Sequence, residues 1–145
     1  MATIEELKTW WSTDCIIDED DLGGAAAKTP MLHSKYLNEL LNAKLKLTKT
    51  ILELNKLRAL KGKYFRGELT TAELQERGWE QWHYKSLKSD IDGLIDADED
   101  VQKEIARLEY IKAMIYFLES VINQIRSRSY DVKAIVEWQK FRAGG

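Results

Sequence analysis

The sequence predicts an all-α protein, an elongated helical bundle with two long helices and a C-terminal amphipathic helix. Three observations lead to this prediction. The 145 residues include one proline and eight glycines, so few residues interrupt helices. Apolar residues recur every three or four positions between Met31 and Tyr64, and every seven positions between Leu87 and Ile122. At this length we expect one domain (residues 1–145), or one folded unit that needs further copies to complete its core.

The N-terminal residues carry the start signal of a short helix. Thr3 and Glu6 form a capping box, which satisfies two free backbone amides and predicts a helix from Thr3 to Trp11. Trp10 and Trp11 at its end either dock on another surface or cover the core of the same subunit.

The first long helix is expected from Met31 to about Tyr64. Asp18 is a suitable N-cap for a short helix before it, although the following glycines weaken that helix. Thr29 and Pro30 then supply a cap and a first helical residue for the long helix. Its buried stripe is expected to contain Leu37, Leu40, Leu41, Leu47, Ile51 and Leu54.

The middle of the chain is a loop followed by a short helix. Thr70 and Glu73 form a second capping box, and Gly78 is expected to end the helix that it starts. An aromatic cluster follows, which we expect to pack between helices: Trp79, Trp82, His83 and Tyr84.

The second half of the chain contains a seven-residue repeat, which predicts a coiled-coil or bundle seam. The repeat consists of Leu87, Leu94, Val101, Leu108, Ile115 and Ile122, with Ile111, Leu118 and Ile125 at the companion position. We expect residues 126–129 (Arg-Ser-Arg-Ser) to interrupt it.

A last amphipathic helix is expected within residues 129–145, after a helical body that comprises residues 1–128. This helix either mediates oligomerisation or covers the end of the core. Its apolar residues are Val132, Ile135, Val136, Trp138 and Phe141.

The composition excludes several classes of protein. The single Cys15 cannot form an internal disulfide, which indicates a reducing compartment. The N-terminus lacks the pattern of a signal peptide, and no stretch is apolar enough to span a bilayer. We therefore expect a soluble, cytoplasmic protein that does not enter membranes.

No catalytic or metal-binding motif is present in the sequence. Asp96, Asp98 and Asp100 alternate as at the start of an EF-hand loop, but Val101 and Arg107 stand where that loop needs glycine and glutamate. A solvated acidic helix turn fits this segment better. The two histidines and Cys15 have no metal-ligand spacing, so we expect no metal, no cofactor and no enzymatic activity.

The region from Lys44 to Gly67 is strongly basic, although the formal net charge of the chain is only -2. Eight cations stand against the single acid Glu53: Lys44, Lys46, Lys49, Lys56, Arg58, Lys61, Lys63 and Arg66. Such a helix either has an ordinary solvated face or binds the phosphates of a polyanion. Tyr64 and Phe65 at its end either plug the core or stack on unpaired bases.

The acidic segment from Asp90 to Glu104 has seven acids and one lysine. It has three open interpretations. It pairs with the basic helix of a neighbouring copy, repels nucleic acid from one face, or contacts a basic partner protein.

The chain resembles the UvsY family, the recombination mediators of T-even-type bacteriophages. The likeness extends over nearly the whole chain. Its anchors are Ile17, Asp18, Leu22, Met31, Leu32, Ser34, Lys35, Leu37, Asn38, Tyr64, Phe65, Gly67, Ala97, Asp98, Asp100, Val101, Ile125, Arg126, Ser127, Arg128, Phe141, Ala143 and Gly144.

The resemblance implies a non-enzymatic protein that binds single-stranded DNA as a ring-like homo-oligomer, of six or seven subunits. It implies a role in displacing single-strand-binding protein and in loading a RecA-like recombinase of the UvsX type, in the cytoplasm of the host cell. The other candidates are a helical adaptor without direct DNA binding and an architectural binder of duplex DNA.

The resemblance also implies functional residues. The family ties a Leu-Lys-Ala-Arg segment to strand binding, and residues 60–63 are the closest match in a shifted register. The role therefore passes to Arg58, Lys61 and Lys63 as a group, and the terminal helix is expected to mediate self-association. The full set of expected DNA contacts is Lys49, Lys56, Arg58, Lys61, Lys63, Tyr64, Phe65 and Arg66.

Overall fold

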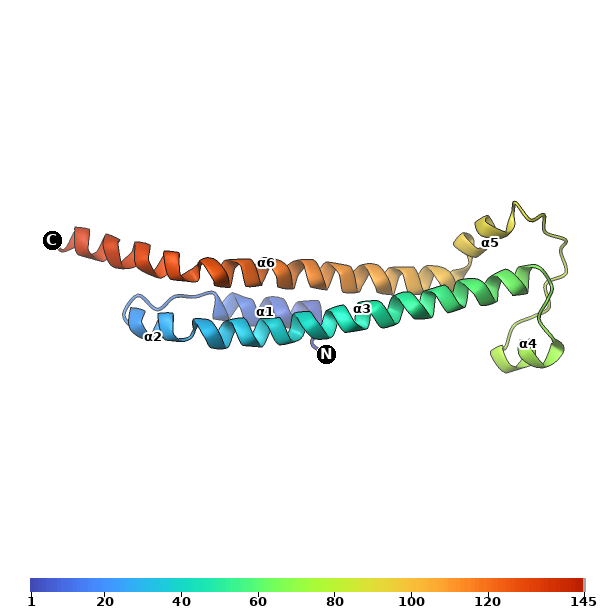
Figure 1. Cartoon of the computed structure of the whole chain (residues 1–145), viewed down its shortest axis with the longest axis horizontal. Helices are drawn as coiled ribbons and strands as arrows, with labels where there is room; N and C mark the ends of the chain where they lie inside the picture. The colour runs from blue at the N-terminus through green and yellow to red at the C-terminus, as the bar shows by residue number, and fades with distance from the viewer. Residues whose placement is uncertain (145) are drawn as a thin grey trace. The chain divides into compact units, whose positions relative to one another are not determined.

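The computed structural model describes residues 1–144 and contains six helices in that range (Figure 1). They are α1 (Ile4–Asp14), α2 (Leu22–Ala27), α3 (Thr29–Phe65), α4 (Thr71–Arg77), α5 (Ile91–Ala97) and α6 (Glu99–Arg142). The predicted all-α fold with two long helices is confirmed. No helix within residues 1–144 combines the length and apolarity that crossing a membrane requires.

The chain divides into two compact units. Unit 1 comprises Met1–Leu45 together with the chain from Ile111 onward, and unit 2 comprises Lys46–Tyr110. The long helices α3 and α6 each contribute residues to both units. The expected functional boundary at residue 128 lies inside unit 1 and stays a prediction.

The core of unit 1 is formed by α1, the first part of α3 and the second part of α6. Its largest fully buried side chains include Leu7, Tyr36, Met114 and Leu118. Trp10 and Trp11 pack against this core, and the ring of Trp11 meets that of Tyr36 edge-on at 5.6 Å between centroids. In this chain the tryptophan pair therefore covers the core of its own subunit, which is one of the two alternatives above.

Asp14 links the end of α1 to α3 and α6. Its carboxylate accepts hydrogen bonds from Lys35 Nζ at 2.7 Å and from the Tyr36 hydroxyl at 2.8 Å, and its backbone oxygen accepts from Arg128. Burial by itself raises the pKa of Asp14, but these donors outweigh burial and hold the pKa below its usual 3.8.

Asp14→Asn is expected to lower the free energy of unfolding at pH 7 by about 1–2 kcal/mol, since the charge-assisted hydrogen bonds are lost. Because the pKa of Asp14 is lower in the folded state, the ionised carboxylate stabilises the fold above pH 4. This contribution is lost as the pH falls through the folded-state pKa. Urea denaturation at pH 7 and at pH 3 checks this. The variant is expected to lose less stability on acidification than the wild type, and an equal loss would contradict the assignment.

Helix α6 is continuous, so the predicted interruption at residues 126–129 is wrong. Ser127 Oγ donates to the backbone oxygen of Gln124, so the hydroxyl group of Ser127 is satisfied by the helix itself. Arg128 is buried in unit 1, and the flanking Ile125 and Val132 are buried as well. Packing on both sides therefore carries the helix through four residues whose local preference favours a break.

Unit 2 has a second core, made by α3, α5 and the start of α6. Its buried residues are Leu54, Phe65, Ile91, Ile95 and Val101. The seven-residue repeat is confirmed except at its start, because Leu87 is exposed and precedes α5. The other repeat residues are buried or half-buried: Leu94, Val101, Leu108, Ile111, Ile115, Leu118, Ile122 and Ile125.

Most helix boundaries follow the predicted local signals. Thr3 and Thr70 cap α1 and α4 with their hydroxyl groups, and Gly78 ends α4 with a φ of 70°. That positive φ favours glycine, because a side chain would clash with the backbone there. The predicted cap Asp18 is wrong: Asp21 caps α2 by accepting from the backbone amide of Gly24, while Asp18 accepts from the amide of Asp20 in a turn.

Candidate nucleic-acid interface

All eight predicted DNA-contact residues lie in unit 2, on the second part of α3 and just beyond it. The buried stripe of this part contains Thr50, Leu54, Lys61 and Phe65. Leu41 and Ile51 are exposed and depart from the predicted stripe. The helix is therefore rotated slightly from the predicted orientation, and this rotation decides which cations reach solvent.

Three lysines form a row on the exposed side of α3. Lys49, Lys56 and Lys63 are all exposed and are spaced by seven residues. Seven residues make two turns, so these side chains share one face and are about 10 Å apart along the helix axis. We call them the lysine row. Lys49 is 4.0 Å from Glu53 in a highly exposed pair, which leaves its charge largely available to solvent.

A hollow of about 410 Å³ lies beside the lysine row, between α3 and α4. Leu57 and Leu60 form its apolar part, and Lys56 and Arg77 supply two cations. Glu53 is the single acid among the lining residues. Apolar surface flanked by cations suits a nucleotide, which has a flat base and a charged phosphate.

Lys61 is enclosed, with only 4% of its surface exposed. Its Nζ atom lies 3.1 Å from Asp98 Oδ1 and 3.1 Å from Asp100 Oδ2, and 3.8 Å from the ring centroid of Trp79. These contacts neutralise the ammonium group inside the protein. Lys61 therefore holds three segments of unit 2 together, and its charge is not exposed to solvent.

Arg58 also has an acidic partner in its own chain. Its Nη1 atom lies 2.8 Å from Asp96 Oδ1, and both side chains remain partly exposed. The acidic segment thus pairs with α3 of the same chain, which is none of the three predicted interpretations. Because the pair is open to solvent, a phosphate can compete with Asp96 for Arg58.

The predicted solvated acidic helix turn is wrong for Asp98, whereas Asp96 and Asp100 are exposed on α5 and α6. Asp98 lies between α5 and α6, and its Oδ2 accepts from the backbone amides of Asp100 and Val101 at 3.1 Å each. It therefore caps α6 while its other oxygen binds Lys61.

Tyr64 and Phe65 plug the end of the core. Phe65 is buried, and its ring meets Trp82 edge-on at 4.9 Å. The Tyr64 ring packs edge-on against Trp79 at 5.3 Å, and its hydroxyl donates to the backbone oxygen of Glu80. Both rings are engaged by other parts of the chain, so this placement corresponds to the core alternative and not to base stacking.

Arg66 is exposed and extends the basic surface beyond α3. It binds Glu68 at 3.1 Å and lines a hollow of about 530 Å³ together with Lys88. The other lining residues are Glu68, Ser86, Ile91 and Asp92. This hollow lies at the end of the loop between α4 and α5.

Tyr84, Lys85 and Lys88 are candidate contacts that were not predicted from the sequence. Tyr84 was expected in the aromatic cluster, but 73% of its surface is exposed, so its predicted packing between helices is wrong. The same prediction is wrong for His83, which is exposed, whereas Trp79 and Trp82 are half-buried as predicted. The available signal was the pairing of an aromatic residue with two lysines in a stretch that has a single acid, Glu80, from Trp79 to Lys88.

The predicted oligomerisation residues lie at the end of α6 in unit 1. Val132 is buried, and Ile135 and Val136 are half-buried. Trp138 and Phe141 are exposed and stack on each other at 5.7 Å between ring centroids. The first three therefore contribute to packing within the unit, while the stacked pair offers apolar surface to another molecule.

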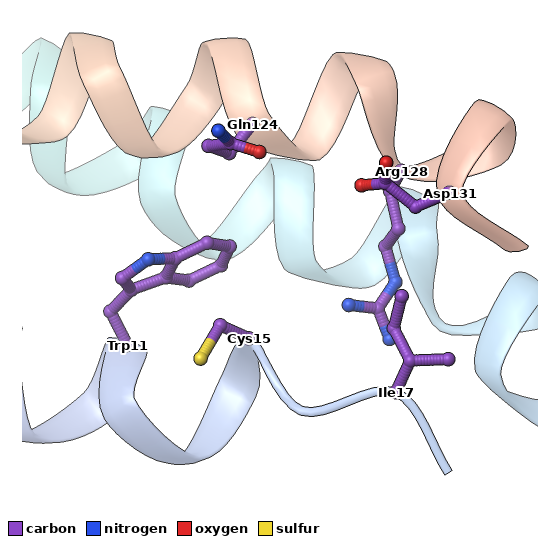
Figure 2. Close-up of a pocket in the computed structure, with 6 residues that line it drawn as sticks. All are labelled: Trp11, Cys15, Ile17, Gln124, Arg128 and Asp131. Carbon is purple, nitrogen blue, oxygen red and sulfur yellow. The ribbon is translucent and has the colours of Figure 1, made fainter. Parts of the chain in front are cut away.

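Unit 1 also contains a hollow of about 250 Å³ between the end of α1 and α6 (Figure 2). Trp11, Cys15 and Ile17 line one side, and Gln124, Arg128 and Asp131 line the other. The Arg128 side chain crosses from α6 toward Ile17, where its guanidinium donates to Asp14. Within residues 1–144, no three histidine, cysteine or acidic side chains group as metal ligands.

Comparisons with known proteins match almost the whole chain. A family model described as "Recombination, repair and ssDNA binding protein UvsY" matches residues 10–145. The recombination protein UvsY of Enterobacteria phage T4 is 29% identical over 143 residues, covering 97% of this chain and 98% of that protein. A crystal structure of the bacteriophage T4 recombination mediator protein UvsY (lattice type II) has a TM-score of 0.81 at 25% identity, covering 99% of each chain. A second lattice (type IV) has a TM-score of 0.83 at 23% identity, covering 97% of this chain and 99% of that one, which shows the same fold.

Proposed function

Since the chain belongs to the UvsY family of recombination, repair and single-stranded DNA-binding proteins, we propose that it loads a RecA-like recombinase of the UvsX type onto single-stranded DNA. It acts in the cytoplasm of the host cell, without enzymatic activity of its own. It binds the strand as a ring-like homo-oligomer and helps to displace single-strand-binding protein.

The observation that carries this proposal is the lysine row on α3. Its three ammonium groups lie on one exposed face, beside a hollow with apolar and basic walls. Each lysine neutralises a phosphate and releases a counterion, which favours binding of any sequence. Arg66 continues this surface, and Arg58 joins it when a phosphate replaces Asp96. Lys61, Tyr64 and Phe65 support the surface from within.

Self-association multiplies these few contacts. Three to five cations give weak, salt-sensitive binding in a single subunit. A closed ring linked through the Trp138–Phe141 pair puts many copies on one strand, which raises avidity without new chemistry. A strand that follows such a ring leaves its path on single-strand-binding protein, and this frees DNA for the recombinase.

Recombinase loading tests the function directly. Filament assembly is measured on single-stranded DNA coated with single-strand-binding protein, with and without this protein. We expect assembly to be faster with it and unchanged on bare DNA at low salt. An adaptor that acts without touching DNA would accelerate assembly and yet show no binding to a labelled strand in fluorescence anisotropy.

Replacing Lys56 and Lys63 together with alanine is expected to weaken strand binding and to flatten its salt dependence. The slope of log K against log salt should fall by about 0.7 for each phosphate that is no longer neutralised. Fluorescence anisotropy over a salt series measures it. The matched control is Lys103→Ala with Lys133→Ala, two exposed lysines outside the lysine row. Equal slopes for the two double variants would contradict a role for the row.

A further inference from the structure

The loop between α4 and α5 is held by two aromatic anchors. Trp79 packs against Tyr64 and lies over the Lys61 ammonium group, and Trp82 packs against Phe65. Trp82 Nε1 also donates to Ser86 Oγ at 3.1 Å within the loop. These contacts fix the part of the loop on either side of Tyr84.

Tyr84 lies outside this anchored layer. Its ring meets Trp82 edge-on at 5.0 Å, with 62° between the planes, and 73% of the residue is exposed. The ring therefore rests on a firm support and keeps most of its surface open. Since Tyr64, Phe65 and the two tryptophans are packed, Tyr84 is the most exposed aromatic side chain of unit 2.

Cations follow Tyr84 directly. Lys85 and Lys88 are exposed, and neither forms an ion pair within residues 1–144. Lys88 shares the hollow of about 530 Å³ with Arg66, whose own charge is partly taken up by Glu68. Asp92 is the other acid that lines this hollow.

We propose that Tyr84 is a stacking platform for an unpaired base, and that Lys85 and Lys88 bind the phosphates that flank this base. The inference rests on the proposed function and adds a site to it, separate from the lysine row. An open ring that is followed in the chain by two exposed lysines suits single strands, because every base has a flat face and duplex DNA keeps its bases stacked. A protein partner for this exposed ring is the competing explanation, and the test separates it.

The test compares Tyr84→Ala with Tyr84→Phe in the full-length protein. The probes are a labelled oligothymidine and a strand of equal length with abasic sites. We expect Tyr84→Ala to weaken oligothymidine binding at least about fivefold, the lower end of what loss of one stacked base produces, with no change on the abasic strand. Tyr84→Phe keeps the ring and should bind as the wild type does.

The control is Tyr116→Ala, since Tyr116 is 75% exposed on α6 in unit 1. Photo-cross-linking with an iodouracil-containing strand adds a direct readout, and its main adduct is expected on Tyr84. Equal binding by the two alanine variants, or an equal loss on both strands, would overturn the stacking site. An adduct on Tyr64 or Phe65 alone would also overturn it.

The failure of this inference is distinguishable from failure of the proposed function. If the wild type binds neither strand, the proposed function fails and the site fails with it. If the wild type binds oligothymidine but Tyr84→Ala binds it equally well, the function stands and Tyr84 has another role. A protein-docking role predicts that second result.

Discussion

Lys61→Ala is expected to lower the free energy of unfolding by about 3 kcal/mol, because it leaves Asp98, whose side chain is only 14% exposed, without its cationic partner. The half-exposed Asp100 loses the same partner. It also removes the cation that lies over the Trp79 ring. Three segments are then no longer joined by a common side chain: α3, the loop after α4, and the start of α6. Urea denaturation of the full-length protein measures the destabilisation.

Lys63→Ala is the matched control for this change. Lys63 is two residues away on the same helix and exposed, so its removal should alter stability by less than about 0.5 kcal/mol. The two variants are expected to affect different properties. Lys61→Ala lowers the stability of the fold, whereas Lys63→Ala lowers the affinity for the strand. If Lys61→Ala keeps full stability while losing strand affinity, Lys61 binds the strand directly after all.

Replacing both Trp138 and Phe141 with glutamate is expected to dissociate the oligomer and to weaken strand binding about 100-fold, because multivalency is lost. The stacked pair is exposed within unit 1, so this change removes apolar surface without opening the core. Truncation before Tyr130 is a poorer test, since it deletes the buried Val132. Sedimentation gives the mass, and anisotropy gives the affinity.

Lys140→Glu is the control for the added charge. It changes the net charge by the same amount on the same part of α6, but it keeps both aromatic rings. We expect this variant to sediment as the wild type does. A Trp138–Phe141 double variant with unchanged mass would exclude the pair from the subunit interface, and the few cations of one subunit would then have to explain all of the affinity.

The helices were predictable because their signals are local. Thr3 with Glu6 and Thr70 with Glu73 specify helix starts through hydrogen bonds that span three residues. The regular spacing of apolar residues, every three or four positions or every seven, predicted α3 and most of α6, and it too is a local signal. The prediction failed at residues 126–129, where Arg128 is buried against α1 and the local tendency to end the helix is overridden.

The candidate site was predictable as a region but not residue by residue. A count of charges located the basic part of α3, and the lysine row lies there. The same count could not separate Lys61 from Lys63, because both are lysines in one helix. Their difference comes from Asp98 and Trp79, which are distant in sequence.

By itself the sequence determined the all-α class, the two long helices, the concentration of positive charge on α3 and the family. These depend on composition, on period and on interactions within one turn. Only the tertiary structure decided which cations and rings face solvent. It buried Lys61 and Phe65, half-buried Tyr64 and left Lys56, Lys63 and Tyr84 open, because exposure depends on which distant segment packs against each side chain.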